Sequence, residues 1–282
     1  MSTTLQAESR FFTANGLRLH YLDWGNSGAL HMVYVHGLRG TAHAFDGTAR
    51  RFRDRYHIMA VDVRGRGESA WSPEGKYDYQ DYVADLESVV DQPGLEHFTL
   101  VGTSMGGIIS MAYAGAHPER LERLILNDIG PDPEPGSDRI TQAVAATPDA
   151  FFTLEEALSF RRSTMPALAR LTEADQREQA LYVVQQEPDG RWVWKMDPAI
   201  GRQRAAGGSP SRPALWPVLQ RLQCPTLVVW GMESDVLSEA QGRRMVDVLP
   251  HGELAAIPGV GHAPTLTEPE AIAALERFLG SG

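Results

Sequence analysis

The sequence is poor in several features that mark particular classes of protein. It contains a single cysteine, Cys224, so no disulfide can form within the chain. Nowhere do about eighteen apolar residues follow one another, and the first residues contain no apolar run of the length found in signal peptides. These absences predict a soluble protein of the cytoplasm. The apolar neighbours of Cys224 predict that its side chain is buried rather than catalytic.

Positive charge is also scarce. The chain has 26 lysines and arginines against 36 aspartates and glutamates, a formal net charge of −10. Binding to nucleic acid or to an anionic membrane requires a basic surface, so both kinds of partner are disfavoured. The histidines show neither the HExxH spacing nor another pattern of metal ligands, so we expect no metal and no other cofactor. The expected partner is a small-molecule or polymeric substrate, and the sequence leaves open whether the chain is a monomer or a homodimer.

Apolar residues make up 43% of the chain, enough for one large core. Short apolar runs predict strands at about 10–14, 17–24, 31–35, 57–62, 97–102, 122–127, 225–230 and 253–257. Helical patterns follow at about 77–92, 105–117, 238–249 and 268–279. The later strands alternate with helices, as in a parallel sheet, whereas the early strands resemble antiparallel hairpins. The sequence thus predicts an α/β fold.

One segment interrupts this alternation. Around residue 131 the turn-rich sequence GPDPEPGSD is followed by helical patterns at about 138–147, 154–163 and 172–186, and a second turn-rich stretch, GGSPSRP, ends the interruption. A further short helix is predicted in ALWPVLQRL, before the next strand. We therefore expect a core made of residues 1–130 and 216–282 and a helical cap, or lid, made of residues 131–215.

The sharpest chemical signal is the segment Gly102–Gly106, GTSMG, between a predicted strand and a predicted helix. A strand, a tight turn and a helix in this order form a nucleophile elbow, in which flanking glycines make room for a strained central residue. The hydroxyl of Ser104 then projects alone above the sheet, at the positive end of a helix dipole. We predict that Ser104 is a catalytic nucleophile.

A serine hydroxyl is a weak nucleophile near neutral pH and needs a base to accept its proton. His262 lies in the loop PGVGHAP, between the last predicted strand and the last predicted helix, where a side chain can turn back over the sheet. His36 also lies at a strand end beside glycine, but it is expected to pack locally or to support the turn. His262 is therefore the predicted general base.

The base in turn needs a carboxylate that accepts its Nδ1 proton and stabilises the imidazolium. Asp235 lies in GMESD, just after the predicted strand 225–230, and so at the carboxyl edge of the sheet, where the sites of α/β enzymes assemble. Two alternatives remain open, Glu233 two residues earlier and Asp128 directly after the predicted strand that ends in LILN. Asp235 is the preferred candidate.

Acyl transfer also needs hydrogen-bond donors aimed at the position where negative charge develops on the carbonyl oxygen. The backbone N–H of Met105, directly after the nucleophile, is one predicted donor. The N–H of Leu38, in the loop HGLRG after a strand, is the other. Gly37 in that loop is equally compatible with a plain tight turn.

Together these motifs resemble those of the α/β-hydrolase superfamily. The resemblance is carried by HG at 36–37, DVRGRGES at 62–69, GTSMGG at 102–107, DIGPD at 128–132, GMESD at 231–235 and GVGHAP at 259–264. It implies a mostly parallel eight-stranded sheet with helices on both faces and a cap inserted after the sixth strand. Members with aspartate as nucleophile act as haloalkane dehalogenases or epoxide hydrolases, so serine at position 104 implies ester-type chemistry instead.

The serine branch of the superfamily includes carboxylesterases, lactonases, thioesterases, carbon–carbon hydrolases and cofactor-free haloperoxidases or perhydrolases. Many carbon–carbon hydrolases have a tryptophan soon after the catalytic histidine, whereas His262 is followed by Ala263-Pro264-Thr265. The segment DIGPD resembles bacterial hydrolases that include promiscuous esterases. We therefore expect a carboxylic ester hydrolase that forms an acyl-enzyme. Carbon–carbon, lactone or haloperoxidase chemistry on the same residues is the alternative, and a non-catalytic ligand-binding protein is least favoured.

Candidate substrate contacts lie in the cap and beside Leu38. Trp192, Trp194 and Met196 alternate in RWVWKM, so they share a face if this stretch is extended; they either line an acyl pocket or bury the cap against the core. Arg39 either binds a substrate carboxylate or has a structural or solvated role. Asp62 is expected to fix its own loop rather than to take part in the chemistry.

Overall fold

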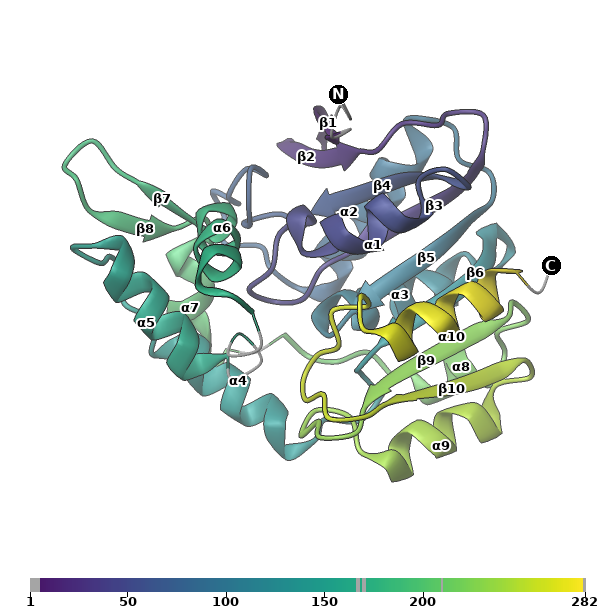
Figure 1. Cartoon of the computed structure of the whole chain (residues 1–282). Helices are drawn as coiled ribbons and strands as arrows, with labels where there is room; N and C mark the ends of the chain where they lie inside the picture. The colour runs from purple at the N-terminus through teal and green to yellow at the C-terminus, as the bar shows by residue number, and fades with distance from the viewer. Residues whose placement is uncertain (1–5, 166–167, 169–170, 209, 281–282) are drawn as a thin grey trace.

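The computed structural model describes residues 6–165, 168, 171–208 and 210–280. The strands of the main sheet are β1 (Glu8–Ala14), β2 (Leu17–Asp23), β3 (Leu30–Val35), β4 (Tyr56–Asp62), β5 (Phe98–Thr103), β6 (Leu121–Asn127), β9 (Thr226–Gly231) and β10 (Gly252–Ile257). They form an eight-stranded sheet in the order β1-β2-β4-β3-β5-β6-β9-β10 (Figure 1). Strand β2 pairs antiparallel with both β1 and β4, and all other neighbouring strands are parallel.

Helices cover both faces of the sheet because its central strands are apolar on both faces. In β3, Met32 and Tyr34 belong to one cluster of buried side chains, and Val33 and Val35 belong to the other. The helices of this part of the chain are η1 (Ala42–Phe45), α1 (Asp46–Phe52), α2 (Tyr79–Asp91), α3 (Met105–Ala116), η2 (Pro118–Arg120), α8 (Trp216–Leu219), α9 (Glu239–Val248) and α10 (Pro269–Gly280). Side chains of α1 and α10 bury one face, and side chains of α2, α3, α8 and α9 bury the other.

The segment 131–215, called the cap segment below, contributes no strand to the main sheet within the residues that the structure describes. It contains α4 (Pro135–Ala145), α5 (Leu154–Thr164), α6 (Glu173–Val183), β7 (Val184–Gln186), β8 (Trp192–Trp194) and α7 (Pro198–Ala205). Strands β7 and β8 form a separate antiparallel ribbon. The helices and the ribbon of this segment lie to one side of the sheet, on the left in Figure 1.

The predicted α/β fold and its mostly parallel sheet are confirmed. All eight predicted strands and four predicted helices of the core are present, with ends that differ by at most two residues. The expectation of early hairpins is correct only for β1 and β2, because β3 and β4 are parallel and joined through α1. Helix α1 escaped prediction because DGTARRF buries only Thr48, Ala49 and Phe52, too few positions to show a helical period. The β7–β8 ribbon and α7 were likewise not predicted as separate elements.

The parallel strands end level with one another. Val35 of β3 lies beside Gly102 of β5, Thr103 beside Asn127 of β6, and Asn127 beside Val229 of β9. In the same way Ile257 of β10 pairs with Gly231 of β9. The residues that follow these strands therefore meet at a single edge of the sheet.

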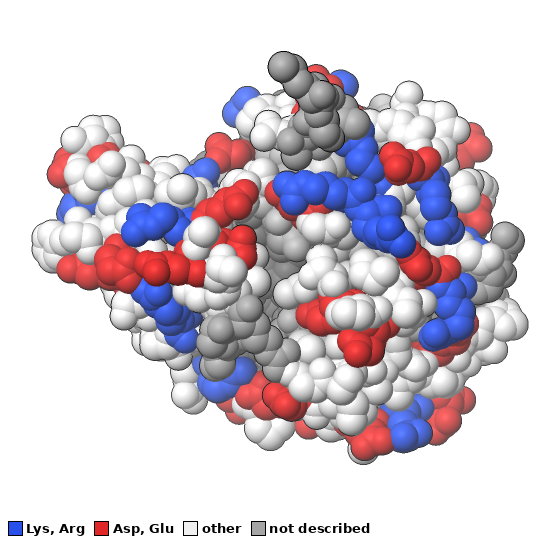
Figure 2. Space-filling model, in the orientation of Figure 1, with Lys and Arg blue, Asp and Glu red and all other residues white. Residues whose placement is uncertain are grey.

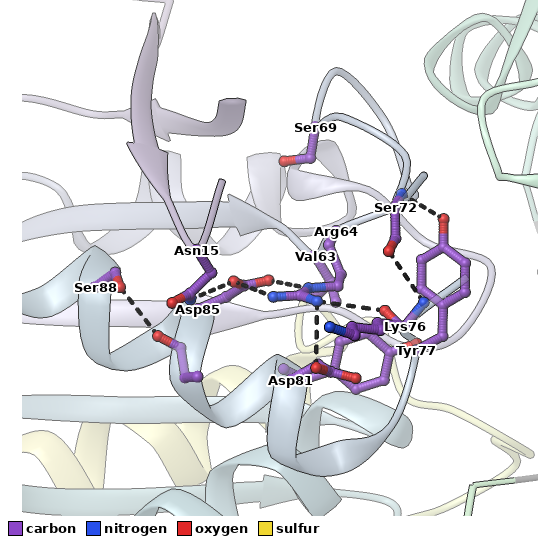
Figure 3. A network of polar contacts seen from close by, with 12 residues as sticks. Asn15, Val63, Arg64, Ser69, Ser72, Lys76, Tyr77, Asp81, Asp85 and Ser88 are labelled. Carbon is purple, nitrogen blue, oxygen red and sulfur yellow. Dashed lines mark hydrogen bonds and ion pairs between the residues drawn. The ribbon is translucent and has the colours of Figure 1, made fainter. Parts of the chain in front are cut away.

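The loop after β4 is fixed by a buried ion pair. Arg64 donates from Nε and Nη2 to the two carboxylate oxygens of Asp85 on α2, at 2.5 and 2.6 Å, and both side chains are buried (Figure 3). Asn15 donates to the same carboxylate at 2.9 Å, and Asp81 lies 3.5 Å from Arg64. A bidentate pair with further donors is the geometry in which a buried charge is well compensated.

The same loop holds the end of the cap segment. Asp197 donates its backbone N–H to Gly65 O at 2.9 Å, and Gly67 donates to Lys195 O at 2.8 Å. The Tyr77 hydroxyl donates to the Asp197 carboxylate. These contacts fix β8 and the start of α7 against the core.

Within the described residues, no helix is long and apolar enough to cross a membrane. Cys224 is buried, as predicted, and burial raises the pKa of its thiol. A raised pKa disfavours the thiolate, so Cys224 is not poised for nucleophilic attack.

The contact between α3 and the loop after β3 provides a test of the fold. A Cβ on Gly106 would lie 2.0 Å from the carbonyl oxygen of Val35 and 2.7 Å from that of His36, so only glycine fits. We expect Gly106→Ala to lower the free energy of unfolding by about 3 kcal/mol or more, because backbone must move to admit the methyl group. Gly28→Ala is the control, since nothing lies within 4 Å of its added Cβ. Equal urea midpoints for the two variants would contradict the described packing.

Candidate active site

Ser104 stands at the turn between β5 and α3. Its backbone has φ 54° and ψ −120°, an uncommon combination for a residue other than glycine. Two hydrogen bonds hold it there: the Ser104 N–H donates to Asn127 O at 3.0 Å, and Gly107 N–H donates to Ser104 O at 2.8 Å. The predicted strand, turn and helix are therefore present, with Ser104 at the strained centre.

His262 lies beside the Ser104 hydroxyl. Its loop connects β10 to α10, and its side chain is 10% exposed. The Nε2 atom is 2.9 Å from Ser104 Oγ, and Nδ1 is 2.8 Å from Asp128 Oδ2. Because a carboxylate only accepts, Nδ1 carries a proton and donates it to Asp128, which leaves Nε2 free to accept from Ser104.

The Asp128 carboxylate is fully buried and receives three hydrogen bonds. Besides His262 Nδ1, the backbone N–H of Gly231 donates to Oδ1 at 2.9 Å and the Ser234 hydroxyl donates to Oδ2 at 2.6 Å. Asp128 itself has φ 56°, and its N–H donates to Val229 O at 2.8 Å. Its orientation toward His262 is therefore set by backbone and side-chain donors from β9 and the turn after it.

The preference for Asp235 as the partner of His262 was wrong, and Asp128, the second alternative, takes that place. Asp235 lies four residues beyond β9, where the turn carries it outward to Arg139 on α4, and its side chain is 46% exposed. Arg139 donates to both of its carboxylate oxygens, at 2.8 and 2.9 Å, and lowers the pKa of Asp235. Glu233, the other alternative, is exposed.

The sequence contained a signal for Asp128. It directly follows β6, the neighbour of the strand that carries Ser104, so no turn separates it from the sheet edge. The preceding Asn127 has a positioning role that sequence reasoning missed. Its Nδ2 donates to Thr103 Oγ1 at 3.0 Å and to Pro264 O at 2.8 Å, and so connects the elbow with the loop of His262.

The two predicted oxyanion donors both lie next to Ser104. Met105 begins α3, so its N–H belongs to the first turn, whose amides have no acceptor within the helix. Leu38 follows Gly37, and a Cβ on Gly37 would lie 3.3 Å from Ser104 Cβ. Buried Arg66, whose contribution sequence reasoning missed, connects them: its Nε donates to Leu38 O at 3.3 Å, and its Nη2 lies 3.6 Å from Met105 Sδ.

His36 is locked as a neutral ring. Its Nδ1 donates to Gly37 O at 2.7 Å, and its Nε2 accepts the N–H of Val63 at 3.0 Å. The ring is fully buried, and burial lowers its pKa to about 4. Both nitrogens are occupied, so His36 supports the loop, as predicted, and has no free atom with which to act as a base.

A second Ser-His-Asp arrangement lies away from the elbow. Ser9 Oγ is 2.8 Å from His20 Nε2, and His20 Nδ1 is 2.7 Å from Asp62 Oδ2. Ser9 lies within β1, paired with β2, and none of the described helices begins beside it. Asp62 also accepts the backbone N–H groups of Ala42 and Glu68, at 2.6 and 2.9 Å, so this trio fixes loops. What distinguishes Ser104 is the helix N-terminus and the donors beside it.

The structure places the predicted substrate contacts at the junction of the core and the cap segment. Trp194 is buried and packs edge-on against Phe160, with ring centroids 6.1 Å apart. Met196 is also buried, and its backbone forms an isolated antiparallel β-bridge with Arg66. Trp192 is half-buried. Arg39 extends from the loop after β3 to the cap segment. Phe152, also in the cap segment, is 80% exposed.

Metal binding has no counterpart in the described part of the chain. No three histidine, cysteine, aspartate or glutamate side chains gather there in a way that could hold a metal ion.

The match to a protein family covers most of the chain. The model of the α/β-hydrolase fold matches residues 31–269. The chain belongs to the α/β-hydrolase family. Among relatives of this α/β hydrolase, the 3-hydroxybutyrate-oligomer hydrolase of Cupriavidus necator is 31% identical over 93% of this chain and 92% of its own. A 2-(acetamidomethylene)succinate hydrolase of Mesorhizobium japonicum is 28% identical over 85% of this chain and 84% of its own. The crystal structure of an α/β hydrolase from Novosphingobium aromaticivorans superposes with a TM-score of 0.88, at 31% identity, and covers 98% of this chain and 99% of that one.

The choice between the two aspartates can be tested by the reactivity of Ser104. In this α/β hydrolase we expect Asp128→Asn to slow labelling of Ser104 by a fluorophosphonate about 10³-fold or more, because the asparagine amide favours the wrong tautomer of His262. Asp235→Asn should change the labelling rate less than about threefold, since Asp235 contacts Arg139 instead. Active-site labelling rates measured by mass spectrometry decide the matter. The reverse order of effects would restore Asp235.

Burial of His36 predicts a dependence of stability on pH. The unfolded chain takes up a proton at a pKa near 6.5, whereas folded His36 does so only at about 4. Stability is therefore fully present above about pH 6.5 and falls by up to about 3 kcal/mol as the pH drops toward 4. In His36→Gln this part of the slope should disappear from urea unfolding curves, whereas exposed His251→Gln should keep it. An unchanged slope in His36→Gln would show that other groups cause the acid sensitivity.

Proposed function

We propose that the chain is a serine hydrolase that cleaves carboxylic esters through an acyl-enzyme. One observation carries the proposal: the ring of His262 touches the Ser104 hydroxyl at 2.9 Å on one side and a buried carboxylate at 2.8 Å on the other. This is the arrangement in which a hydroxyl can lose its proton as it attacks a carbonyl carbon. We further propose that residues 1–130 and 216–282 form the catalytic core and that the cap segment covers the site.

In the first half of the reaction, Ser104 Oγ bonds to the ester carbonyl carbon while its proton passes to His262 Nε2. The electron pair of the C=O bond moves to oxygen, and the N–H groups of Leu38 and Met105 donate to that oxyanion. When the C=O bond re-forms, the bond to the alkoxy oxygen breaks. The leaving oxygen takes the proton from Nε2, which yields an alcohol and an acyl-enzyme.

In the second half, a water molecule attacks the acyl carbon and gives a proton to His262 Nε2. Collapse of the new tetrahedral species breaks the bond to Ser104 Oγ, which regains that proton, and releases a carboxylic acid. Asp128 keeps its negative charge throughout. It stabilises the imidazolium that forms in each half and holds Nδ1–H in place.

The relatives support ester cleavage over the alternatives. The Cupriavidus necator protein is named for hydrolysis of 3-hydroxybutyrate oligomers, and oligomers of a hydroxy acid are joined by esters. A non-heme chloroperoxidase of Kitasatospora aureofaciens is 27% identical over 89% of this chain, so haloperoxidase chemistry on the same residues stays an alternative. Carbon–carbon or lactone cleavage also stays open, because the three residues serve each of them.

The test combines labelling with turnover. A fluorophosphonate should label Ser104 in the wild type, and p-nitrophenyl butyrate should be hydrolysed. Ser104→Ala should lower kcat about 10⁴-fold or more because the nucleophile is lost. Ser9→Ala is the matched control, since it removes the hydroxyl of the other Ser-His-Asp arrangement and should leave both readouts unchanged.

Two results would contradict the proposal in different ways. Labelling at Ser9, or at neither serine, would remove the assignment of the site. Labelling of Ser104 without turnover of any ester in a chain-length series would support Ser104 as the nucleophile but contradict ester hydrolysis. Carbon–carbon or oxidative chemistry would then be the favoured function.

A further inference from the structure

Arg39 joins the proposed oxyanion loop to the cap segment. It directly follows Leu38, and its guanidinium donates from Nη2 to Thr147 Oγ1 at 2.9 Å and from Nη1 to Thr164 Oγ1 at 3.1 Å. The same group lies 5.3 Å from the ring centre of Phe160 and 5.1 Å from that of Trp194. Two hydroxyl groups and two aromatic rings therefore hold the positive charge of Arg39 in place, and Arg39 is the residue directly after Leu38.

Arg161 brings a second positive charge to α5, the helix that carries Phe160 and Thr164. Phe160 and Thr164, which contact Arg39, lie on either side of Arg161 within one helical turn. Arg161 is 4% exposed, and its Nη1 donates to Gln176 O at 3.3 Å. Burial and, to a smaller extent, the charge of Arg39 together lower its pKa to about 10, so the two groups lie within electrostatic reach of each other. Burial also lowers the pKa of Arg39 to about 10, and both groups stay charged at neutral pH.

Neither arginine has an acidic partner in the described part of the chain. No ion pair within 4 Å is formed by Arg39 or Arg161, and the buried Nε of each has no hydrogen-bond partner there. The residues outside the described ranges include no aspartate or glutamate. The neighbouring Arg162 shows the contrast, since it pairs with exposed Glu155. On the visible face, acidic side chains gather over the cap segment, at the left of the molecule in Figure 2.

A buried guanidinium group, that of Arg161, and a half-buried one, that of Arg39, stand without an acidic partner in the described part of the chain, unlike Arg64, which pairs with Asp85. Such uncompensated charges lower the stability of the fold. A carboxylate supplied from outside would relieve that cost. The planar guanidinium presents paired donors that match the two oxygens of a carboxylate. The hydrogen bonds from Arg39 to Thr147 and Thr164 set its orientation before any ligand arrives.

We propose that Arg39 and Arg161 form a carboxylate-binding subsite, so that the preferred substrates are esters with a free carboxylate a few bonds from the scissile bond. Short oligoesters of hydroxy acids and half-esters of dicarboxylic acids belong to this class. The inference rests on the proposed ester hydrolysis and adds the charge of the substrate to it. The carboxylate is held at the junction of the core and the cap segment, while the ester carbonyl lies at Ser104.

The kinetic test uses two substrates that differ only in charge, the linear dimer of 3-hydroxybutyrate and its methyl ester. Cleavage of the internal ester is followed by chromatography of the products. We expect the wild type to favour the anionic dimer in kcat/KM. Arg39→Gln and Arg161→Gln should each lower kcat/KM for the anionic dimer about tenfold to hundredfold and for the methyl ester less than threefold. Arg39→Lys and Arg161→Lys should restore part of the loss, and Arg162→Gln should change neither substrate.

A binding measurement judges the subsite without turnover. In a Ser104→Ala background, calorimetry should show the anionic dimer binding at least tenfold more tightly than its methyl ester, and Arg39→Gln or Arg161→Gln should abolish that difference. Circular dichroism and melting curves of each variant identify any that does not fold. If a Gln variant does not fold, the corresponding Lys variant is compared with the wild type instead.

The possible results separate the two proposals. Equal effects of the Gln variants on both substrates, or no preference for the anion in the wild type, overturn the subsite but leave ester hydrolysis standing. If no ester is hydrolysed, the proposal of ester hydrolysis is contradicted. The subsite is then judged only by whether the anionic dimer binds more tightly than its methyl ester in calorimetry.

Discussion

The hydrogen bond between His262 Nδ1 and Asp128 is the interaction on which the rest of the site depends. It decides which ring nitrogen holds the proton and therefore which one faces Ser104. The bond is possible because β5, β6 and β9 end level with one another, so that residues far apart in sequence meet at one edge. Donors from Gly231 and Ser234 then leave the Asp128 carboxylate a single orientation. The fold thus aligns the ends of the strands, and the polar residues there place Ser104, His262 and Asp128 in the order that the proposed proton transfer requires.

Around these residues the structure pairs some interior charges with an acidic group and leaves others without an acidic partner among the described residues. Arg64 is matched by Asp85, and the resulting rigid loop holds Tyr77 and the end of the cap segment. Arg39 and Arg161 have no such match among the described residues, although Arg161 is as buried as Arg64 and Arg39 is half-buried. In a protein with a net charge of −10, these two positive charges fit the proposed carboxylate subsite, which acts on a bound ligand and not by long-range attraction.

Much of this could be read from the sequence, for physical reasons that differ from residue to residue. The buried strands and the elbow at Ser104 have strong local patterns, because apolar runs, glycines and a following helix all lie within a few residues. Which acidic residue pairs with His262 depends instead on the direction of a turn. The four residues after β9 carry Asp235 to Arg139, and no periodicity in GMESD shows that direction. Helix α1 and the roles of Asn127, Arg66 and Arg161 depend on contacts between segments far apart in the chain, which a single sequence does not display.

The position of the acid after β6 has a consequence for how such a protein can diversify. Because the turn after β9 does not supply the catalytic carboxylate itself, its Asp235 is available to hold α4 through Arg139 and through the N–H of Gly136. The residues of the proposed proton transfer and the attachment of α4 are thereby divided between two strands. Substitutions at the attachment of α4 can alter the surroundings of the site and leave the His262–Asp128 contact in place, so in the proposed enzyme specificity can evolve separately from catalytic power.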